Sequence, residues 1–535
     1  MPDRYRLNNL PLPLAATEAQ LAAAIARQIG VAAGQVHEPL VVRRALDARQ
    51  KRNIHHVCSV EFALAAPPKR LPAGVEAVAQ SALDVPRPDF LQRAPRTQRV
   101  AIVGAGPAGL FAALALAEAG FTVSLFERGQ PVELRMRDIG RLRSRGELNP
   151  ESNICFGEGG AGTYTDGKLY TRIKHPLLRW VLAEFVRFGA NPEILIDAHP
   201  HLGTDKLVRI VRAMRQHLLA LGVEYRFGAR VDDLLLGNGG VRGVRLANGE
   251  EIVAEHVVLA TGHSARDTFA RLLALGLPLE SKPFAVGVRA EHPQALIDAI
   301  QFGLQRPAQL PAAEYSVTHQ ADDPYLGQRG IYSFCMCPGG LIVPSPTEEG
   351  MSAINGMSNA RRSGRFANSG VVVQVTPDDL RRHGIGDSPL AGIEFQRQLE
   401  RAAFLATTAP YAAPAMRLTD FVARRASGTL AASSYKPGIE PFDLWQLFPE
   451  WLASPLADGL RGFDRKMRGY VTAEANLLGV ESRTSSPVRI VRGESMQVPG
   501  FAGLYPIGEG AGYAGGIVSA AVDGLKAAEQ IIAGG

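Results

Sequence analysis

The sequence predicts an α/β protein built around a parallel sheet, and three observations support this. Residues 99–127 read as a short apolar strand, a helix rich in small residues and a second apolar strand, which is the pattern of a βαβ unit. A glycine-rich turn joins the first strand to the helix, and a strand, a glycine loop and a helix follow at 503–535. With 535 residues, the chain is long enough for two to four domains.

The composition is that of an ordinary globular protein. Hydrophobic residues make up 46% and charged residues 21%, and a net charge of +6 is mild for this length, so it does not by itself indicate nucleic acid. Four cysteines without a CxxC pair predict neither a disulfide scaffold nor a metal site. The N-terminus has no apolar signal core, and the most apolar helix, 110–121, contains Glu118 and is too short to span a bilayer. These features predict a reduced, cytoplasmic protein with no membrane partner.

The first 85 residues form a unit of their own in the predicted organisation. A strand at 5–12, a helix at 17–30 and two strands at 39–50 and 54–64 give an order that suits a small α+β domain of the ferredoxin-like kind. A Pro- and Arg-containing linker is expected at 86–98.

Beyond the linker, one nucleotide-binding domain is expected in two parts. Its first part covers 99–275 and includes a helix at 205–222 and a β-meander at 239–262 with an Asn248-Gly249 turn. A mixed α+β substrate or cap domain at 276–480 is inserted, and residues 481–535 complete the first domain.

The turn after the first strand carries the motif G-x-G-x-x-G in the strand–turn–helix context that it requires. Gly104 would make the tight turn, Gly106 would let backbone approach a pyrophosphate, and Gly109 would let the helix pack on the strand. Glu127 ends the second strand 23 residues after Gly104, where a carboxylate binds ribose hydroxyls and disfavours a 2′-phosphate. This Rossmann-like pattern predicts a dinucleotide site; the alternative is a glycine-rich packing turn without a ligand.

Three separated blocks resemble flavoproteins that have a glutathione-reductase-like FAD domain. They are the βαβ unit with Glu127, the meander ending in Thr261-Gly262, and the segment Gly508-Glu509 followed by Gly515-Gly516-Ile517. The resemblance implies non-covalent FAD, with Glu509 standing where the family usually has Asp. The residues that it implies for cofactor binding are Gly104, Gly106, Pro107, Ala108, Gly109, Glu127, Arg128, Gly159, Gly160, Gly162, Val231, Thr261, Gly262, Gly508, Glu509, Gly515, Gly516 and Ile517.

The whole chain is similar to a bacterial group of FAD-dependent dehydrogenases that has no agreed substrate. The similarity is most specific at 156–169, 333–340, 354–370 and 481–490. It implies an oxidoreductase that transfers hydride or electrons between FAD and a small organic molecule. In the first of these stretches the glycines, including Gly157, are expected beneath the flavin and pyrophosphate; the alternative is a flexible surface loop.

Catalytic residues are left open by the sequence. Cys335 and Cys337 form a C-x-C pair that could shuttle electrons or add to a substrate, although an alternating strand would also place two small side chains on one face, and packing is the favoured interpretation. His263, Tyr164, Lys168 and Tyr513 could donate a proton, but hydrogen bonding to FAD or anchoring of a loop is favoured for each.

The motifs that the sequence contains or lacks also indicate partners and alternative functions. No second G-x-G-x-x-G follows a strand, so NAD(P)H is expected at most as a transient electron donor. The basic stretch 43–52 could bind RNA, but a solvated loop between two strands is favoured. A flavin-dependent monooxygenase, a tRNA-modifying flavoenzyme and a non-catalytic flavoprotein remain as alternatives, and the oligomeric state is not predicted.

Overall fold

The computed structural model describes residues 4–66, 70–92, 98–237, 239–304 and 306–534. It confirms a mixed α/β protein with a Rossmann-like domain, and its centre is a five-stranded parallel sheet in the order β22-β11-β5-β6-β7. These strands are β5 (Arg99–Val103), β6 (Thr122–Glu127), β7 (Glu224–Phe227), β11 (His256–Leu259) and β22 (Leu504–Pro506). The near-continuous burial of β5, β6, β11 and β22 is typical of a sheet that is covered on both faces, whereas β7 at the edge is partly exposed.

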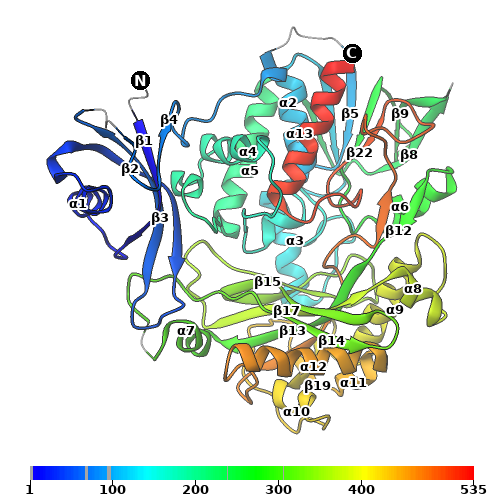
Figure 1. Cartoon of the computed structure of the whole chain (residues 1–535). Helices are drawn as coiled ribbons and strands as arrows, with labels where there is room; N and C mark the ends of the chain where they lie inside the picture. Colours follow the sequence, from blue (N-terminus) through cyan, green and yellow to red (C-terminus); the bar gives the residue numbers. More distant parts are fainter. Residues whose placement is uncertain (1–3, 67–69, 93–97, 238, 305, 535) are drawn as a thin grey trace.

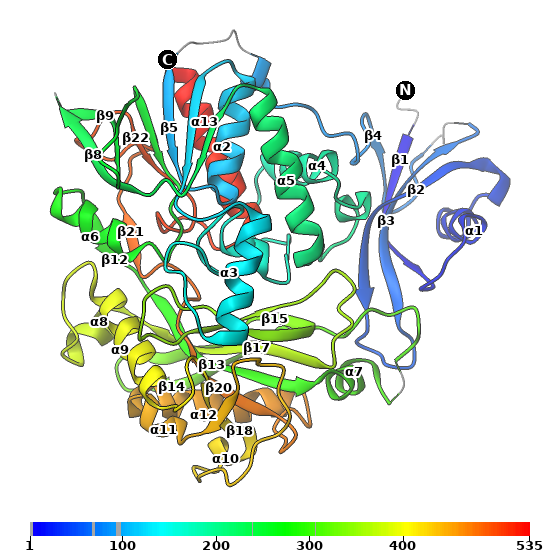
Figure 2. The same ribbon diagram turned by 180° about the vertical axis from the view of Figure 1, so that it is seen from behind.

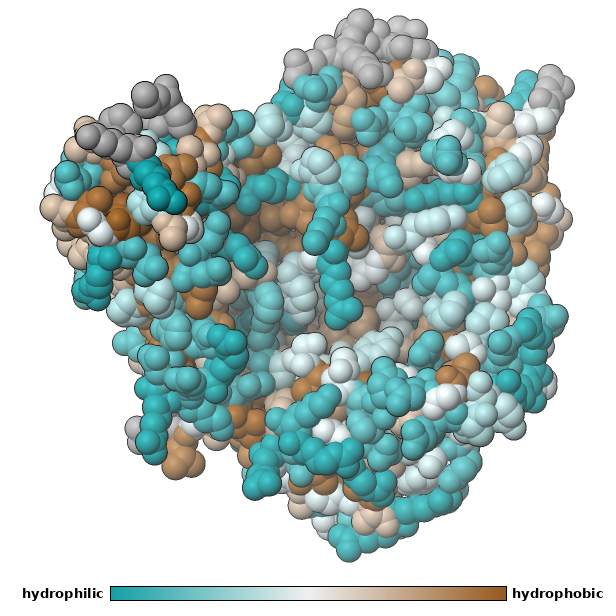
Figure 3. All heavy atoms as spheres, in the orientation of Figure 1, coloured by the Kyte–Doolittle hydropathy of each residue, from teal (hydrophilic) through white to brown (hydrophobic). Residues whose placement is uncertain are grey.

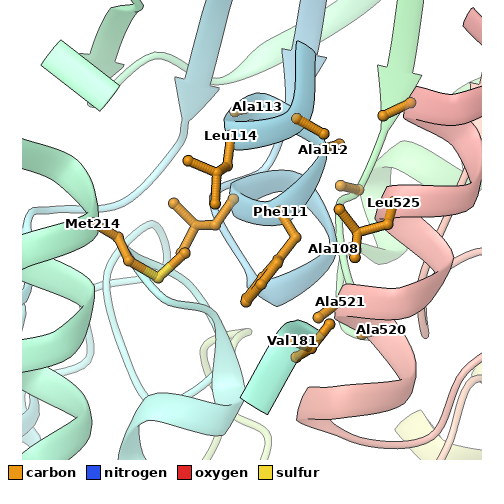
Figure 4. Packing of buried hydrophobic residues seen from close by; sticks show 14 of the residues in the cluster. Ala108, Phe111, Ala112, Ala113, Leu114, Val181, Met214, Ala520, Ala521 and Leu525 are labelled. Carbon is orange, nitrogen blue, oxygen red and sulfur yellow. The ribbon is translucent and has the colours of Figure 1, made fainter. Parts of the chain in front are cut away.

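Helices cover one face of this sheet. Figure 1 shows α2 and α13 side by side, with α4 and α5 beside them. Small residues bring α2 and α13 together, since a Cβ at Gly524 would stand 2.1 Å from the carbonyl oxygen of Ala108. Figure 4 shows Ala108, Ala520 and Ala521 at this contact. The helices of this part are α2 (Pro107–Glu118), α3 (Val132–Arg145), α4 (Leu177–Arg187), α5 (Thr204–Ala220) and α13 (Ile517–Gly534), with 3-10 turns η2 (Asp89–Gln92), η3 (Ala161–Tyr164) and η4 (Pro192–Leu195).

A β-meander covers the opposite face. Along β5 the side chains alternate, so Ala101 and Val103 pack against the meander while Val100 and Ile102 face the helices. The meander lies at the outer side of the molecule in Figure 2. Its strands are β8 (Val231–Gly237), β9 (Gly240–Leu246) and β10 (Glu251–Val253); α6 (Arg266–Ala274) follows β11, and β12 (Leu279–Ser281) pairs with β21 (Val488–Ile490).

The middle of the chain forms a large sheet below the Rossmann-like part (Figure 1). Its order is β14-β15-β17-β13-β20-β18-β19, with β16 paired to β15, and β20 straddles position 480, where a domain boundary is expected. The strands are β13 (Phe284–Pro293), β14 (Thr318–Asp323), β15 (Gly327–Pro344), β16 (Ile354–Met357), β17 (Phe366–Val375), β18 (Ala413–Arg417), β19 (Ile439–Pro441) and β20 (Asn476–Glu481). The helices around it are α7 (Gln294–Phe302), α8 (Pro377–Arg382), α9 (Ala391–Leu405), α10 (Leu418–Val422), α11 (Leu444–Leu447) and α12 (Glu450–Lys466).

One face of the large sheet packs on helices, and the other turns toward the Rossmann-like part. Val286, Val288 and Ala290 of β13 share a hydrophobic cluster with Leu456 and Leu460 of α12. Because side chains alternate along a strand, the residues between them point to the opposite face. That face therefore lies where it can close a site formed by the Rossmann-like part.

The N-terminal residues form a separate four-stranded antiparallel sheet in the order β2-β3-β1-β4. Figures 1 and 2 both show it as a lobe at one side. Its elements are β1 (Arg4–Leu12), α1 (Glu18–Ile29), η1 (Ala33–Gln35), β2 (Val36–Asp47), β3 (His55–Leu64) and β4 (Val75–Val78). Residues 93–97 of the expected linker, and residues 1–3 and 67–69 of the expected N-terminal domain, lie outside the described residues.

The favoured interpretation of the basic stretch 43–52 was a solvated loop between two strands, and this is wrong for the first part of the stretch. Arg43 and Arg44 lie inside β2, and only the later residues make the turn to β3. Arg44 pairs with Asp197 at 2.8 Å, and its backbone exchanges hydrogen bonds with Ile196 and Ala198, which joins the N-terminal sheet to the rest. Within the described part of the chain, no helix has the length and apolarity to cross a bilayer.

Candidate functional site

Three loops meet at the carboxyl ends of adjacent parallel strands. They follow β5, β11 and β22, and they touch through backbone. A Cβ at Gly104 would stand 2.4 Å from the carbonyl oxygen of Ala260, and one at Gly510 would stand 2.5 Å from that of Gly262. Ligands of open α/β sheets bind at this end. The contacts leave no room for side chains, so the three loops form a cradle lined by backbone.

The first loop has the form that a pyrophosphate requires. Gly104 has φ +105°, and a Cβ at Gly109 would stand 2.0 Å from the carbonyl oxygen of Gly104, so glycine is needed at both positions. Gly106 is the N-cap of α2 and supplies no capping side chain, and Pro107 follows at the first helical position. The helix therefore presents first-turn N–H groups and the positive end of its dipole to an anion.

Glu127 is held at the end of β6 by backbone donors. Its buried carboxylate accepts hydrogen bonds from the N–H groups of Ala105, Gly129 and Gly157 at 2.9, 2.9 and 3.0 Å. A carboxylate offers about four acceptor positions, so one is left for a ribose hydroxyl. Arg128, the next residue, pairs with Glu151 and Asp267 at the surface.

The glycine loop, defined here as residues 156–164, spans the cradle. The N–H of Gly159 donates to the carbonyl of Ala105 at 2.8 Å, and a Cβ at Gly160 would stand 3.0 Å from the Cα of Gly106. At its other end, a Cβ at Gly162 would stand 2.8 Å from a side-chain carbon of Ile517, the first residue of α13. The loop thus links the pyrophosphate turn to the N-terminus of the last helix.

Arg135 organises the glycine loop, and the sequence reading missed it. Its fully buried guanidinium donates to the carbonyls of Asn153, Ile154, Gly157, Glu158 and Gly160 at 2.7–3.1 Å. A sequence signal existed, because Arg135 falls on the same helical stripe as the apolar residues of α3.

The third loop is held by another missed pair. Asp523 of α13 accepts from the N–H of Gly508 at 2.8 Å and forms a two-pronged ion pair with Arg492 at 2.7 and 2.9 Å. Arg492 also donates to the carbonyl of Pro506 at 2.7 Å. These bonds fix the loop that carries Glu509.

Glu509 is the polar side chain left free in the cradle. It is partly buried, and among the described residues its carboxylate has no hydrogen-bond partner. Burial raises its pKa to about 7, while Lys282 acts in the opposite direction. A ribityl hydroxyl would supply the missing partner, so the residues present fit FAD.

The other expected cofactor residues differ in how near they lie to this cradle. Thr261 and Gly262 follow β11, and a Cβ at Gly104 would stand 3.3 Å from the Cα of Thr261. Gly515 and Gly516 immediately precede α13, with open space around Gly515. Val231 starts β8 at one edge of the meander, and Ala108 lies 2.9 Å from where a Cβ of Gly508 would be.

The proposed proton donors differ in their surroundings. The Tyr164 hydroxyl is buried and donates to the carbonyl of Val132 at 3.0 Å, and burial raises its pKa to about 12. Burial and the nearby Arg483 lower the pKa of His263 to about 4, which leaves it neutral near pH 7. Tyr513 is more exposed and lies under the guanidinium of Arg492. Lys168 pairs with Asp166 at 3.0 Å and remains 16% exposed.

The two cysteines of the C-x-C pair do not alternate as in a regular strand. Their register with β17 shifts between Phe334 and Cys337, and Cys335 has φ +44°, a backbone conformation that favours glycine. Cys335 is partly exposed and Cys337 is buried. The packing interpretation assumed a regular strand, and the bulge removes that premise. Cys155 lies elsewhere, 3.9 Å from Arg483.

Figure 3 shows a recess between the N-terminal lobe and the remainder of the molecule. Tyr170 and His199 stack at a ring distance of 4.8 Å, and both are partly exposed. His199 in turn pairs with Glu314 at 3.1 Å.

Comparison with protein families assigns several parts of the chain. Residues 283–484 match "FAD-dependent protein, C-terminal domain-like", 206–349 match "FAD dependent oxidoreductase", and 102–145 match "NAD(P)-binding Rossmann-like domain". Residues 4–63 match a domain of unknown function.

Two solved structures show low similarity to the chain. E. coli quinol fumarate reductase FrdA is 14% identical with a TM-score of 0.36, covering 82% of this chain and 71% of that one. CtdE in complex with FAD is 11% identical with a TM-score of 0.30, covering 81% and 83%. Because these identities and TM-scores are low, the family of the chain is assigned from the sequence matches and not from these structures.

One relative covers nearly everything. An uncharacterized protein of Clostridium beijerinckii is 39% identical over 532 residues, 98% of each chain. Two chains that are this similar over their full length belong to one family and share one fold. The family models matched above identify the cofactor and the reaction class of that family. The chain therefore belongs to a bacterial family of FAD-dependent oxidoreductases that includes the Clostridium beijerinckii protein, and FAD is its cofactor.

Proposed function

We propose that this flavoenzyme transfers hydride or an electron pair between bound FAD and a small organic substrate. The observation that carries the proposal is the extended cradle, which joins an anion-binding helix start at Gly106 to a second helix start at Ile517 through one glycine loop. A dinucleotide with a phosphate bridge and a polar ring system matches these two ends.

Each part of the cradle has a proposed role. The start of α2 would bind the pyrophosphate, Glu127 the adenosine ribose, and Glu509 the ribityl chain. The start of α13 would stabilise negative charge on the ring, because the N-terminus of a helix carries partial positive charge. Arg135 and Asp523 act as positioning residues that hold two of the loops.

FAD supplies the redox chemistry, and the chain binds it, orients it and limits its contact with water. We propose that residues 276–480 shape the substrate pocket with the sheet face that turns toward the Rossmann-like part. Residues 1–85 would form a separate ferredoxin-like domain, a proposal supported by the strand order β2-β3-β1-β4. NAD(P)H would visit only transiently, and no nucleic-acid or membrane partner is proposed.

An anaerobic titration of the purified yellow protein with NADH and NADPH tests the proposal. Rapid loss of the oxidised flavin bands with one nucleotide would identify the donor and establish the reductive half-reaction. If neither nucleotide acts, small organic reductants should bleach the flavin instead. A flavin that dithionite reduces but no nucleotide or organic donor reduces would contradict the proposal and favour a non-catalytic flavoprotein.

A further inference from the structure

The dithiol cluster, defined here as Cys335, Cys337, Arg289, Lys168 and Asn368, lies on the sheet face that turns toward the Rossmann-like part. Arg289 alternates along β13 with residues that pack on α12, so it points to the opposite face. Its guanidinium donates to the carbonyl of Cys335 at 2.7 Å, and its Nη2 lies 3.8 Å from the sulfur of Cys337.

The bulge in β15 brings the two cysteines together. The sulfur of Cys337 lies 3.3 Å from the carbonyl oxygen of Cys335, so the second side chain folds back over the first residue. Positive φ at a non-glycine residue is costly, and such residues are enriched at functional sites. The bulge therefore costs stability in return for an arrangement that a regular strand would not give.

The environment distinguishes the two sulfurs. The neighbouring thiol of Cys335 lowers the pKa of Cys337, and the positive charges of Arg289 and Lys168 act in the same direction. The neighbouring thiol of Cys337 and burial raise the pKa of Cys335. Two neighbouring thiols whose pKa values are shifted in opposite directions are an arrangement suited to thiol–disulfide chemistry.

A buried donor without a partner adds to this. Asn368 faces Cys337 directly across β17 and β15. Its side-chain oxygen accepts from Arg289 at 2.8 Å, but its side-chain nitrogen is buried with no hydrogen-bond partner. A buried donor without a partner costs free energy, so this one is available for a sulfur anion or a ligand.

Lys168 connects the cluster to the FAD cradle. Its ammonium group donates to the carbonyl of Met336, the residue between the two cysteines. Lys168 follows the glycine loop, in which Gly162 contacts the start of α13 at Ile517. Only five residues of chain lie between Gly162 in the cradle and Lys168, which anchors the cysteine pair.

We propose that Cys335 and Cys337 form a dithiol/disulfide couple that exchanges an electron pair with the bound FAD. This proposal rests on the proposed function. In the oxidising direction, the two S–H bonds break and one S–S bond forms, and the two electrons and two protons pass to oxidised FAD, which becomes FADH₂. The reverse reaction reduces the disulfide and regenerates oxidised FAD. Cys335, the less buried residue of the two, is the one closer to external reactants.

The experiment measures disulfide formation and counts electrons. The holoenzyme is oxidised with ferricyanide and is then desalted, denatured, alkylated and digested with trypsin. Both cysteines fall in the single peptide 330–361. We expect this peptide to resist alkylation and to be two hydrogen masses lighter than its reduced form. Anaerobic dithionite titration of the oxidised holoenzyme should consume about four electrons per FAD, because each couple accepts two.

Matched variants identify the couple. Cys335→Ser and Cys337→Ser should each lower the consumption to about two electrons per FAD. Cys58→Ser and Cys155→Ser should leave it at about four, because these cysteines lie outside the dithiol cluster. The peptide mass of the wild-type protein needs no variant, so poor folding of a variant would not block the test.

Two results would overturn the proposal. In one, both cysteines remain alkylatable after oxidation and the wild type takes only two electrons per FAD. In the other, the disulfide forms but the wild type still takes two electrons, which would mean that the couple is not connected to FAD. Reduction of FAD by nucleotide or organic donors in either case would leave the proposed function standing, so the two failures are distinguishable.

Discussion

At the scale of single residues, the unpaired carboxylate of Glu509 is the feature of the protein that points to a bound cofactor. A partly buried carboxylate without a hydrogen-bond partner is unfavourable in the protein alone, and its raised pKa records that cost. The hydroxyls of a ribityl chain would relieve it. The same side chain should therefore make both cofactor affinity and stability depend on pH.

The affinity of the apoprotein for FAD should rise between pH 6 and pH 8. Glu509 has a pKa of about 7, so it ionises in this interval, and a hydroxyl binds an ionised carboxylate more strongly than a protonated one. Titrating apoprotein with FAD and following flavin fluorescence at several pH values measures this. Glu509→Gln should bind FAD with little pH dependence; an equal slope in variant and wild type would contradict the assignment.

The stability of the apoprotein should change with pH in the opposite direction. A carboxyl group whose pKa is raised on folding keeps its proton in the native state while the unfolded chain has already lost it. Its contribution is favourable at low pH and is lost as the pH rises from the ordinary carboxyl range through about 7. Glu158 and Glu481 also have a pKa of about 7, so the difference between wild type and Glu509→Gln isolates one group.

At the scale of elements, the glycine loop depends on a side chain from another element. Arg135 of α3 donates hydrogen bonds to three carbonyls of the loop and to two carbonyls just before it. A guanidinium has five N–H donors in a fixed plane, whereas a lysine ammonium has three on a flexible stem. The shape of the loop is therefore specific to arginine.

Arg135→Lys should lower both the melting temperature and the affinity for FAD. Lysine would leave some buried carbonyls unpaired, at a cost of about 1–3 kcal/mol for each one. The matched control is Arg137→Lys on the exposed side of the same helix, which should change neither quantity. Thermal unfolding with and without FAD measures the two effects. If both variants kept wild-type stability and affinity, Arg135 would not be the residue that shapes the loop.

Local patterns were sufficient to predict the parallel strands, the helix after Gly106 and the position of Glu127. They work because strand and helix periodicity and turn glycines act over short stretches of chain. They could not give Arg135 or Asp523, whose partners are backbone atoms on distant segments. Nor could they give the bulge at Cys335, because a strand of apolar and small residues carries no local sign of a register shift.

At the scale of the whole molecule, a buried ion cluster joins the Rossmann-like part to the large sheet. Glu400 of α9 binds Arg266 at the start of α6 at 2.7 Å and Arg483 beyond β20 at 2.9 Å. The two arginines keep the pKa of Glu400 well below its usual range. The cluster holds the sheet face against the cofactor side, so both parts should unfold together.

Glu400→Gln should destabilise the protein by about 3–5 kcal/mol, because it leaves two buried guanidinium groups without their shared anion. A carboxyl group with a lowered pKa stabilises the protein above the ordinary carboxyl range and loses this effect as the pH falls. The wild type should therefore lose more stability on acidification than the variant. Glu394→Gln, exposed on the same helix, is the control. Urea unfolding at pH 7 and pH 4 measures the free energy of unfolding of each protein. If the wild type and Glu400→Gln lost equal stability on acidification, the role of Glu400 would be contradicted.

The order of segments in the cradle has a consequence for how the protein is made. The pyrophosphate turn and Gly508 lie on adjacent loops, yet all of the chain between them must be synthesised before they can meet. Until α13 emerges, the face of α2 that packs on α13 has no cover. FAD can therefore bind only late in biosynthesis. A nascent chain that pauses before α13 would expose apolar residues of α2 to chaperones and proteases.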